Sequence, residues 1–173
     1  GISPWHPAIP VVGLNSTRQA LEQAGFAVLA YPNPQGMKWT KLLMNIMGNA
    51  SSAILDMPPK DIFADPMLVD LEIEAWRETL SVMTASDISP VNIGSYPFGL
   101  LAPLVRTMPN IFLRRILRAK IDSARGGKMP SLHIDLRSGR SRSEIPWLNG
   151  AVKEKGETVN IQTPINQMFT EVL

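Results

Sequence analysis

The chain has 173 residues, of which 45% are hydrophobic and 18% charged, an ordinary globular composition with enough residues for one core. Cysteine is absent, which excludes disulfides, thiolate metal sites and a cysteine nucleophile, and the two histidines, His6 and His133, argue against a multi-histidine metal centre. The formal net charge is only +2.

The first 36 residues predict a β-α-β pattern. The runs 9–14 and 26–31 favour strands, and Ser16 and Gly25 mark the start and the stop of a helix between them. Two strands alone would expose unpaired edges, and residues 31–36 are typical of a linker. We therefore interpret residues 1–36 as the remnant of the end of a Rossmann-type domain plus linker.

The residues after Gly36 predict helices. Asp65 followed by Pro66 is a strong helix start, and Thr163 with Pro164 marks the last one. The expected helices span 37–55, 65–85, 104–120 with an interruption at Pro109, 129–138, 144–156 and 164–172, with a loop over 87–103. The fold class predicted is mainly α, a helical bundle over 37–173 preceded by the β-α-β remnant.

Charge is distributed unevenly along the chain. Residues 106–142 hold 10 Lys and Arg against 2 Asp and Glu, a net of +8, and the remainder carries a net of −6. One interpretation is a binding surface for nucleic acid or another polyanion, and the other is a solvated, arginine-rich surface. Phe112 is the lone aromatic residue of this stretch, so stacking on nucleic-acid bases has poor support.

A polar row runs along the predicted helix 37–55. Lys41, Asn45 and Asn49 recur every four residues among Leu, Ile and Met, and on one helix such a row forms a single stripe. The stripe either faces water or lines a cleft in which a partly buried lysine and two amides bind a ligand.

A second polar segment spans residues 128–150. Ser131 follows the Gly126-Gly127 break, and Ser143 with Glu144 opens the next predicted helix. Both serines fit helix caps, Glu144 fits a helix dipole, and His133 fits packing or surface exposure better than metal ligation. Asp135 with Arg137 or Arg140 fits a local ion pair.

Together the two segments resemble the ketopantoate reductase family. The resemblance rests on ordered motifs: Trp39, Lys41-x3-Asn45-x3-Asn49, Pro130-Ser131-Leu132, Asp135, Gly139-Arg140, Ser143-Glu144-Ile145, Asn149-Gly150 and Thr163-Pro164-x-Asn166. It covers 37–173 and implies the family's C-terminal helical domain, of the 6-phosphogluconate dehydrogenase C-terminal-like type. Ala24-Gly25-Phe26 resembles a turn near the end of the family's nucleotide-binding domain.

The resemblance implies reduction of 2-dehydropantoate to pantoate with NADPH. Lys41 matches the catalytic lysine that protonates the developing alkoxide, and we expect it to be partly buried. Asn45, Asn49 and Ser131 match substrate-binding residues, and Glu144 matches the acid that positions cofactor and substrate. Pro59 and Lys128 stand where family members can carry amides, which bears on the substrate.

The chain contains no G-x-G-x-x-G turn, the phosphate-binding motif of dinucleotide domains. We therefore expect a chain that carries the substrate half, binds NADPH poorly by itself and lacks reductase activity alone. The absence of a signal peptide pattern and the prolines within 88–105 favour an intracellular, cytoplasmic protein without a membrane span. The alternative is a stand-alone helical module that binds polyanions or dimerises, and a homodimer is compatible with both hypotheses.

Overall fold

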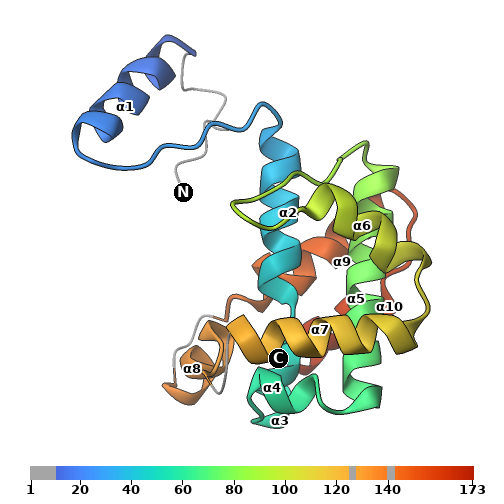
Figure 1. Ribbon diagram of the computed structural model, residues 1–173. Coiled ribbons are helices and arrows are strands. Elements are labelled where there is room, and N and C mark those ends of the chain that lie inside the picture. Colours follow the sequence, from blue (N-terminus) through green and yellow to red (C-terminus); the bar gives the residue numbers. More distant parts are fainter. Residues whose placement is uncertain (1–10, 125–127, 140–142) are drawn as a thin grey trace.

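The computed structural model describes residues 11–124, 128–139 and 143–173, and its helices pack as an irregular bundle (Figure 1). In chain order the elements are α1 (Val11–Gln23), α2 (Pro34–Ile46), α3 (Asn49–Leu55), α4 (Pro59–Ile62), α5 (Pro66–Ala85), α6 (Phe98–Thr107), α7 (Asn110–Ala124), α8 (Ser131–Arg137), the 3₁₀ turn η1 (Ile145–Trp147), α9 (Asn149–Thr158) and α10 (Pro164–Val172). The prediction of a mainly α domain is confirmed. Among the described residues no helix has the length and apolar character to cross a membrane.

The predicted β-α-β pattern is not formed in the part of the chain that the structure describes. Residues 11–14 open α1 instead of a strand, so Ser16 lies inside the helix and does not cap it. Residues 26–31 are extended but pair with no strand, and without a partner a strand's backbone groups gain nothing over solvent. The predicted stop is correct, since α1 ends at Gln23 and Gly25 follows with φ +83°.

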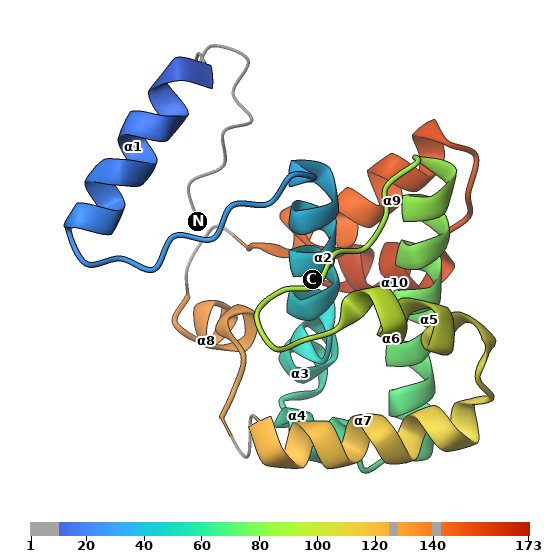
Figure 2. The same ribbon diagram turned by 45° about the horizontal axis from the view of Figure 1, so that its top comes forward.

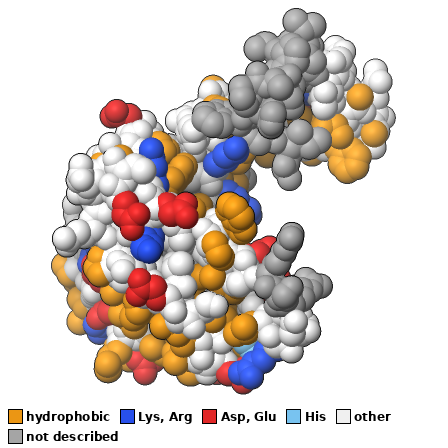
Figure 3. Space-filling view, turned by 180° about the vertical axis from the view of Figure 1, so that it is seen from behind, with side chains coloured by type: hydrophobic (Ala, Val, Ile, Leu, Met, Phe, Trp, Pro, Cys, Tyr) orange, Lys and Arg blue, Asp and Glu red, His pale blue; other side chains and the backbone are white. Residues whose placement is uncertain are grey.

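α1 and the extended segment after it form an arm that stands off the bundle (Figures 1 and 2). In the space-filling view an open notch separates the arm from the helical body, and hydrophobic side chains on the arm stay uncovered (Figure 3). Phe26 and Leu29 are 63% and 70% exposed. The bundle, and not the arm, therefore holds the core.

The long helix α5 forms the centre of the bundle and packs against α2, α6, α7, α9 and α10. Asp65 caps its first turn by accepting from the amides of Met67 and Leu68, and Pro66 occupies the first helical position, as predicted. Its buried face repeats at helical spacing through Val69, Ile73, Trp76, Leu80 and Met83. This stripe is the largest contribution of one helix to the main core.

The predicted helix over 37–55 is broken in two at Met47 and Gly48. Gly48 has φ +69°, a conformation that favours glycine, and a Cβ added there would lie 3.1 Å from the ring of Phe63, a tight contact. Glu72 of α5, 3% exposed, accepts from the amide of Gly48 at 2.7 Å and from the hydroxyl of Ser51. A carboxylate from another helix thus caps the start of α3 and stabilises the break.

The later helices follow their local signals closely. α10 begins at Pro164 after Thr163 as predicted, and Pro109 separates α6 from α7. Three details were not predicted: α6 already starts at Phe98 within the expected loop, the short α4 follows Pro58, and the expected helix 144–156 splits into η1 and α9. The split follows from Pro146, which lies in the 3₁₀ turn, and from Leu148, whose φ and ψ are not helical.

Two buried asparagines join α5, α9 and α10. The Nδ2 of Asn166 donates to the carbonyl of Ala75 at 3.0 Å and to Glu78 at 2.7 Å, and its Oδ1 accepts from Asn149 at 2.9 Å. Glu78 also accepts from the amides of Ile165 and Asn166, so it caps the start of α10. Asn149 and Asn166, two of the sequence motifs, are therefore structural in the bundle.

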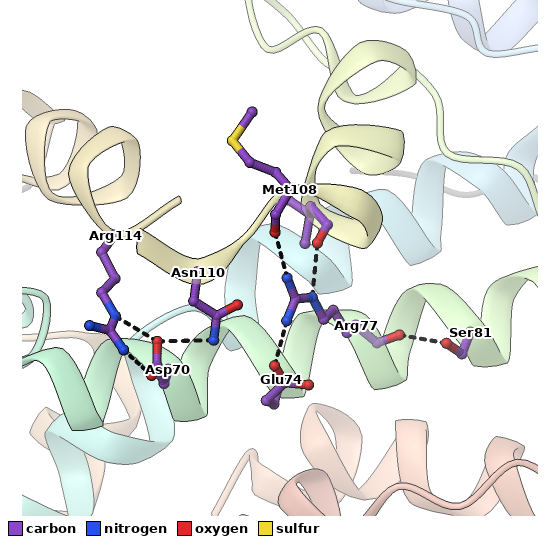
Figure 4. Close-up of polar contacts among 8 residues, drawn as sticks. Asp70, Glu74, Arg77, Ser81, Met108, Asn110 and Arg114 are labelled. Atoms are coloured by element: carbon purple, nitrogen blue, oxygen red, sulfur yellow. Dashed lines mark hydrogen bonds and ion pairs between the residues drawn. The ribbon is translucent and has the colours of Figure 1, made fainter. Parts of the chain in front are cut away.

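On the other side of α5, polar side chains fasten α6 and α7 (Figure 4). Arg77 donates to the carbonyls of Val105 and Met108 at 2.9 and 2.8 Å, so it satisfies the C-terminal end of α6, and it pairs with Glu74. Asp70 accepts from Asn110 and Arg114 of α7. The Arg114 guanidinium lowers the pKa of the Asp70 carboxyl below its ordinary value.

Candidate functional site

A hollow of about 480 Å³ opens where α2 meets α3, beside α8 and η1. Polar groups line it from three stretches of the chain, together with an apolar wall: Asn45, Asn49, Lys128, Met129, Pro130, Ser131, Ile134, Glu144 and Leu148. Four of the five predicted site residues thus meet in one place although 99 positions separate Asn45 from Glu144. Groups of this kind can hold a small molecule that has both oxygen atoms and an apolar part.

The fifth predicted residue, Lys41, lies in an adjoining groove. That groove is lined by Lys38, Trp39, Lys41, Leu42, Asn45, Trp147, Leu148 and Ala151. Asn45 and Leu148 belong to both depressions, so the groove and the hollow share a border. Lys41 is exposed, and the expectation of partial burial is wrong because the α2 face that carries it has no covering helix among the described residues.

Asn49 connects helices that line the hollow. It is 6% exposed, and because of the break at Gly48 it belongs to α3 and not to the helix of Lys41 and Asn45. Its Oδ1 accepts from the amide of Leu132 at 3.3 Å, and its Nδ2 donates to the carbonyl of Asn45 at 3.2 Å. The side chain therefore links the end of α2 to the first turn of α8, while it also lines the hollow.

Ser131 and Glu144 are exposed and line the hollow together with the two asparagines. Ser131 is the first residue of α8, and the position before it, Pro130, has no side-chain cap, so the cap interpretation of Ser131 is not borne out. The Oγ of Ser143 accepts from the amide of Ile145 at 3.2 Å, so Ser143 bonds the first residue of η1, although Glu144 and not Ser143 occupies the N-cap position. The Ser131 hydroxyl and the Glu144 carboxylate are placed where they can meet a ligand.

α8 carries Ser131 and is fastened to α3 by Asp56. The Nε2 of His133 and the Nη2 of Arg137 each lie 2.6 Å from one carboxylate oxygen of Asp56. The hydrogen bond from His133, followed by the charge of Arg137, lowers the pKa of Asp56. Arg137 forms this longer-range pair with Asp56, and Arg140, the other residue expected to pair with Asp135, lies outside the described residues. No signal in the sequence pointed to Asp56.

Three of the ten basic residues in the stretch 106–142 bind groups of this chain at its surface. Arg106 donates to the carbonyl of Leu80 and to Thr84, Arg114 pairs with Asp70, and Arg137 pairs with Asp56. These contacts support the interpretation as a structural and solvated surface over a polyanion site. The described residues contain no group of three or more His, Asp or Glu side chains that could hold a metal ion.

Comparison with known proteins identifies the family that this chain matches. The family described as ketopantoate reductase PanE/ApbA C terminal matches residues 33–173. The 2-dehydropantoate 2-reductase of Pyrobaculum aerophilum is 27% identical over 160 residues, which cover 92% of this chain and 50% of that protein. The chain thus spans half the length of this relative.

Solved structures agree on the fold. The PanE/ApbA family ketopantoate reductase from Ralstonia eutropha superimposes with a TM-score of 0.71 at 22% identity, over 91% of this chain and 46% of that one. A ternary structure of D-mandelate dehydrogenase with NADH and anilino(oxo)acetate gives a TM-score of 0.70 at 19% identity, over 93% and 59%. At these identities the likeness concerns the fold alone.

Proposed function

The chain belongs to the ketopantoate reductase C-terminal family, and from this premise we propose that it supplies the substrate site and the proton donor of an NADPH-dependent reductase acting on 2-dehydropantoate. The relative from Pyrobaculum aerophilum is named as a 2-dehydropantoate 2-reductase, which supports this substrate. The reaction belongs in the cytoplasm under this proposal, and homodimer formation stays a prediction.

The observation that carries the proposal is the meeting of Asn45, Asn49, Ser131 and Glu144 in one hollow, with Lys41 in the groove next to it. The amide of Asn45 and the hydroxyl of Ser131 can donate to the carboxylate and hydroxyl oxygens of a 2-oxo acid. The apolar wall of Met129, Ile134 and Leu148 can cover its alkyl part.

Lys41 is assigned the proton. When a 2-oxo group is reduced at carbon, its oxygen gains negative charge and takes a proton. A lysine ammonium beside that oxygen stabilises the charge and donates the proton in the same step. Lys41 lies across Asn45 from the hollow, so a substrate held by Asn45 can turn its 2-oxo group toward the ammonium.

Under this proposal the reacting end of the cofactor would bind at the groove beside Lys41. The bound nicotinamide would supply the hydride to the carbon of the 2-oxo group. The groove beside Lys41 is open, and Trp147, 79% exposed, offers an aromatic face beside it. Glu144 would orient the substrate and the carboxamide end of the cofactor from the hollow. The phosphates would be held elsewhere, since the chain has no glycine-rich turn to cradle them.

Binding of substrate to the chain tests the proposal. A calorimetric or NMR titration of the 173-residue chain with 2-dehydropantoate should show saturable binding, and Lys41→Ala should weaken it about tenfold through the loss of one charge-assisted contact. Lys60→Ala is the matched control, because Lys60 is an exposed lysine on α4 outside the hollow and the groove.

Turnover provides the second measurement. Where the chain acts together with a nucleotide-binding domain, Lys41→Ala should abolish NADPH oxidation by 2-dehydropantoate, and the circular dichroism spectrum should not change. Wild-type turnover in Lys41→Ala, or equal substrate affinity in the Lys41 and Lys60 variants, would refute the assignment of Lys41.

A further inference from the structure

α8 is a helix of seven residues that packs chiefly on α3. An isolated helix of seven residues is unstable in water, so tertiary contacts must hold it in place. Leu132 is its buried side chain, packed with Ala50 and Ala53 of α3, whereas Ile134 and Leu136 are 51% and 45% exposed. The position of α8 therefore depends on its contacts with α3.

Asp56 provides the ionic part of that attachment. It ends α3 in the left-handed conformation, with φ 55°, which turns the chain sharply at this point. Its two carboxylate oxygens each accept from a different side chain of α8, His133 and Arg137, at 2.6 Å. These two residues are four positions apart and lie on one face of the helix, so the carboxylate contacts α8 over a full turn.

The imidazole of His133 has no second anchor among the described residues. Its Nδ1 is buried and makes no hydrogen bond there, while Nε2 meets the carboxylate of Asp56. Nε2 is therefore assigned the hydrogen that is donated, and the orientation of the ring depends on Asp56. The side chain of His133 is 12% exposed and that of Asp56 is 55% exposed, so the imidazole is shielded from water while the carboxylate faces it.

We propose that Asp56 is a positioning residue of the site: through His133 and Arg137 it holds α8 against α3 and so keeps Ser131 at the wall of the hollow. The proposal rests on the proposed function for the role of Ser131 toward a substrate carboxylate. Ser131 lies two residues before His133, at the end of α8 where Asn49 holds the amide of Leu132. The other described contacts at this end of α8 include the hydrogen bond from the amide of Leu132 to Asn49 and the packing of the Leu132 side chain.

Hydrogen exchange of the 173-residue chain measures the attachment directly. In Asp56→Ala, exchange of the amides of residues 131–137 should accelerate about tenfold or more, while α5 and α10 keep their protection. Asp87→Ala is the matched control, since Asp87 also follows a helix end in the left-handed conformation, with φ 56°, and carries the same backbone strain when substituted. Asp56→Asn keeps an acceptor and tolerates this conformation, so it should restore part of the protection.

Affinity for pantoate, the reduced product, gives the second readout. Asp56→Ala should weaken pantoate binding about tenfold, Asp56→Asn less, and Asp87→Ala should not change it. Unchanged exchange of α8 in Asp56→Ala would overturn the proposal, and so would faster exchange with unchanged pantoate affinity. Failure of the unaltered chain to bind pantoate would instead overturn the proposed function, and the exchange data would still decide the role of Asp56 in holding α8.

Discussion

The surroundings of α5 and those of α8 use polar side chains in opposite ways. Around α5 the carboxylates of Glu72 and Glu78 are each taken up by backbone amides of a neighbouring helix, and they fix how helices start. Around α8 the functional groups of Ser131 and Glu144 are exposed on a hollow. The polar side chains around α5 stabilise the fold, and those around α8 are available to a ligand. Substitutions in the first region should therefore change the free energy of unfolding, and those in the second should change ligand affinity.

The largest effect on stability is expected from Asn166→Ala in the framework. Asn166 is fully buried, and its removal leaves the Nδ2 of Asn149 without its acceptor and takes one of the donors from the carbonyl of Ala75, which also accepts from Thr79. An unsatisfied buried group costs about 1–3 kcal/mol, so the free energy of unfolding should fall by roughly 3 kcal/mol. Urea unfolding followed by circular dichroism measures it.

Gln167→Ala is the control for this substitution. Gln167 is the next residue of α10, is exposed, and pairs with Glu171 one turn on, so its loss should cost no more than a few tenths of a kcal/mol. Equal losses in the two variants would show that the Asn149–Asn166 pair does not hold α9 and α10 to α5, and the contrast between the two regions would then collapse.

A smaller effect is expected from acid acting on Asp70. Its pKa is lowered in the folded chain from the ordinary value of 3.8, chiefly by the hydrogen bond from Arg114. The unfolded chain therefore takes up the proton first, and the stabilising contribution is complete at neutral pH and disappears as pH falls through the lowered pKa.

Asp70→Asn isolates this contribution. At pH 7 the variant should unfold at lower urea concentration than the unaltered chain, with a smaller loss than in Asn166→Ala because the pair is partly solvated. The difference between variant and unaltered chain should shrink between pH 5 and about pH 3. A difference that does not change with pH would assign the effect to packing and not to the ion pair.

Local signals predicted most of the framework. Both helix starts, at Asp65-Pro66 and at Thr163-Pro164, are encoded by residues within four positions of each other. Both helices begin where the sequence predicts. The break at Gly48 could not be predicted in this way, because the carboxylate that caps α3 belongs to Glu72, 24 residues further on. Residues 11–14 of the predicted strand 9–14 form part of α1 instead, and residues 9 and 10 lie outside the described part of the chain. A strand requires a partner that sequence periodicity does not supply.

The candidate site was predictable in its members but not in its construction. A family resemblance named Asn45, Ser131 and Glu144, and the fold brings them to one hollow, while their roles remain predictions. Asp56 could not be predicted because its partner His133 is 77 residues away in the sequence. An Asp and a His that far apart form no recognisable sequence motif.

The smallest effect on stability is expected from Ser131→Ala, and it tests the exposed half of the comparison most directly. Ser131 caps no helix and is exposed, so the free energy of unfolding should change by less than about 0.5 kcal/mol. Pantoate affinity should nevertheless fall about tenfold, since a hydrogen bond to a carboxylate is lost. Urea unfolding and calorimetric titration on the same preparation give both numbers.

Ser138→Ala separates a site effect from a general effect on α8. Ser138 follows the last residue of the same helix, is exposed, and its hydroxyl donates to the carbonyl of Asp135 at 2.9 Å, so it shares the helix but not the hollow. Weaker pantoate binding in both variants would mean that the ligand responds to the stability of α8 as a whole. Weaker binding in Ser131→Ala alone would assign the effect to the Ser131 hydroxyl, because Ser138→Ala is the substitution that removes a hydrogen bond at the end of the helix.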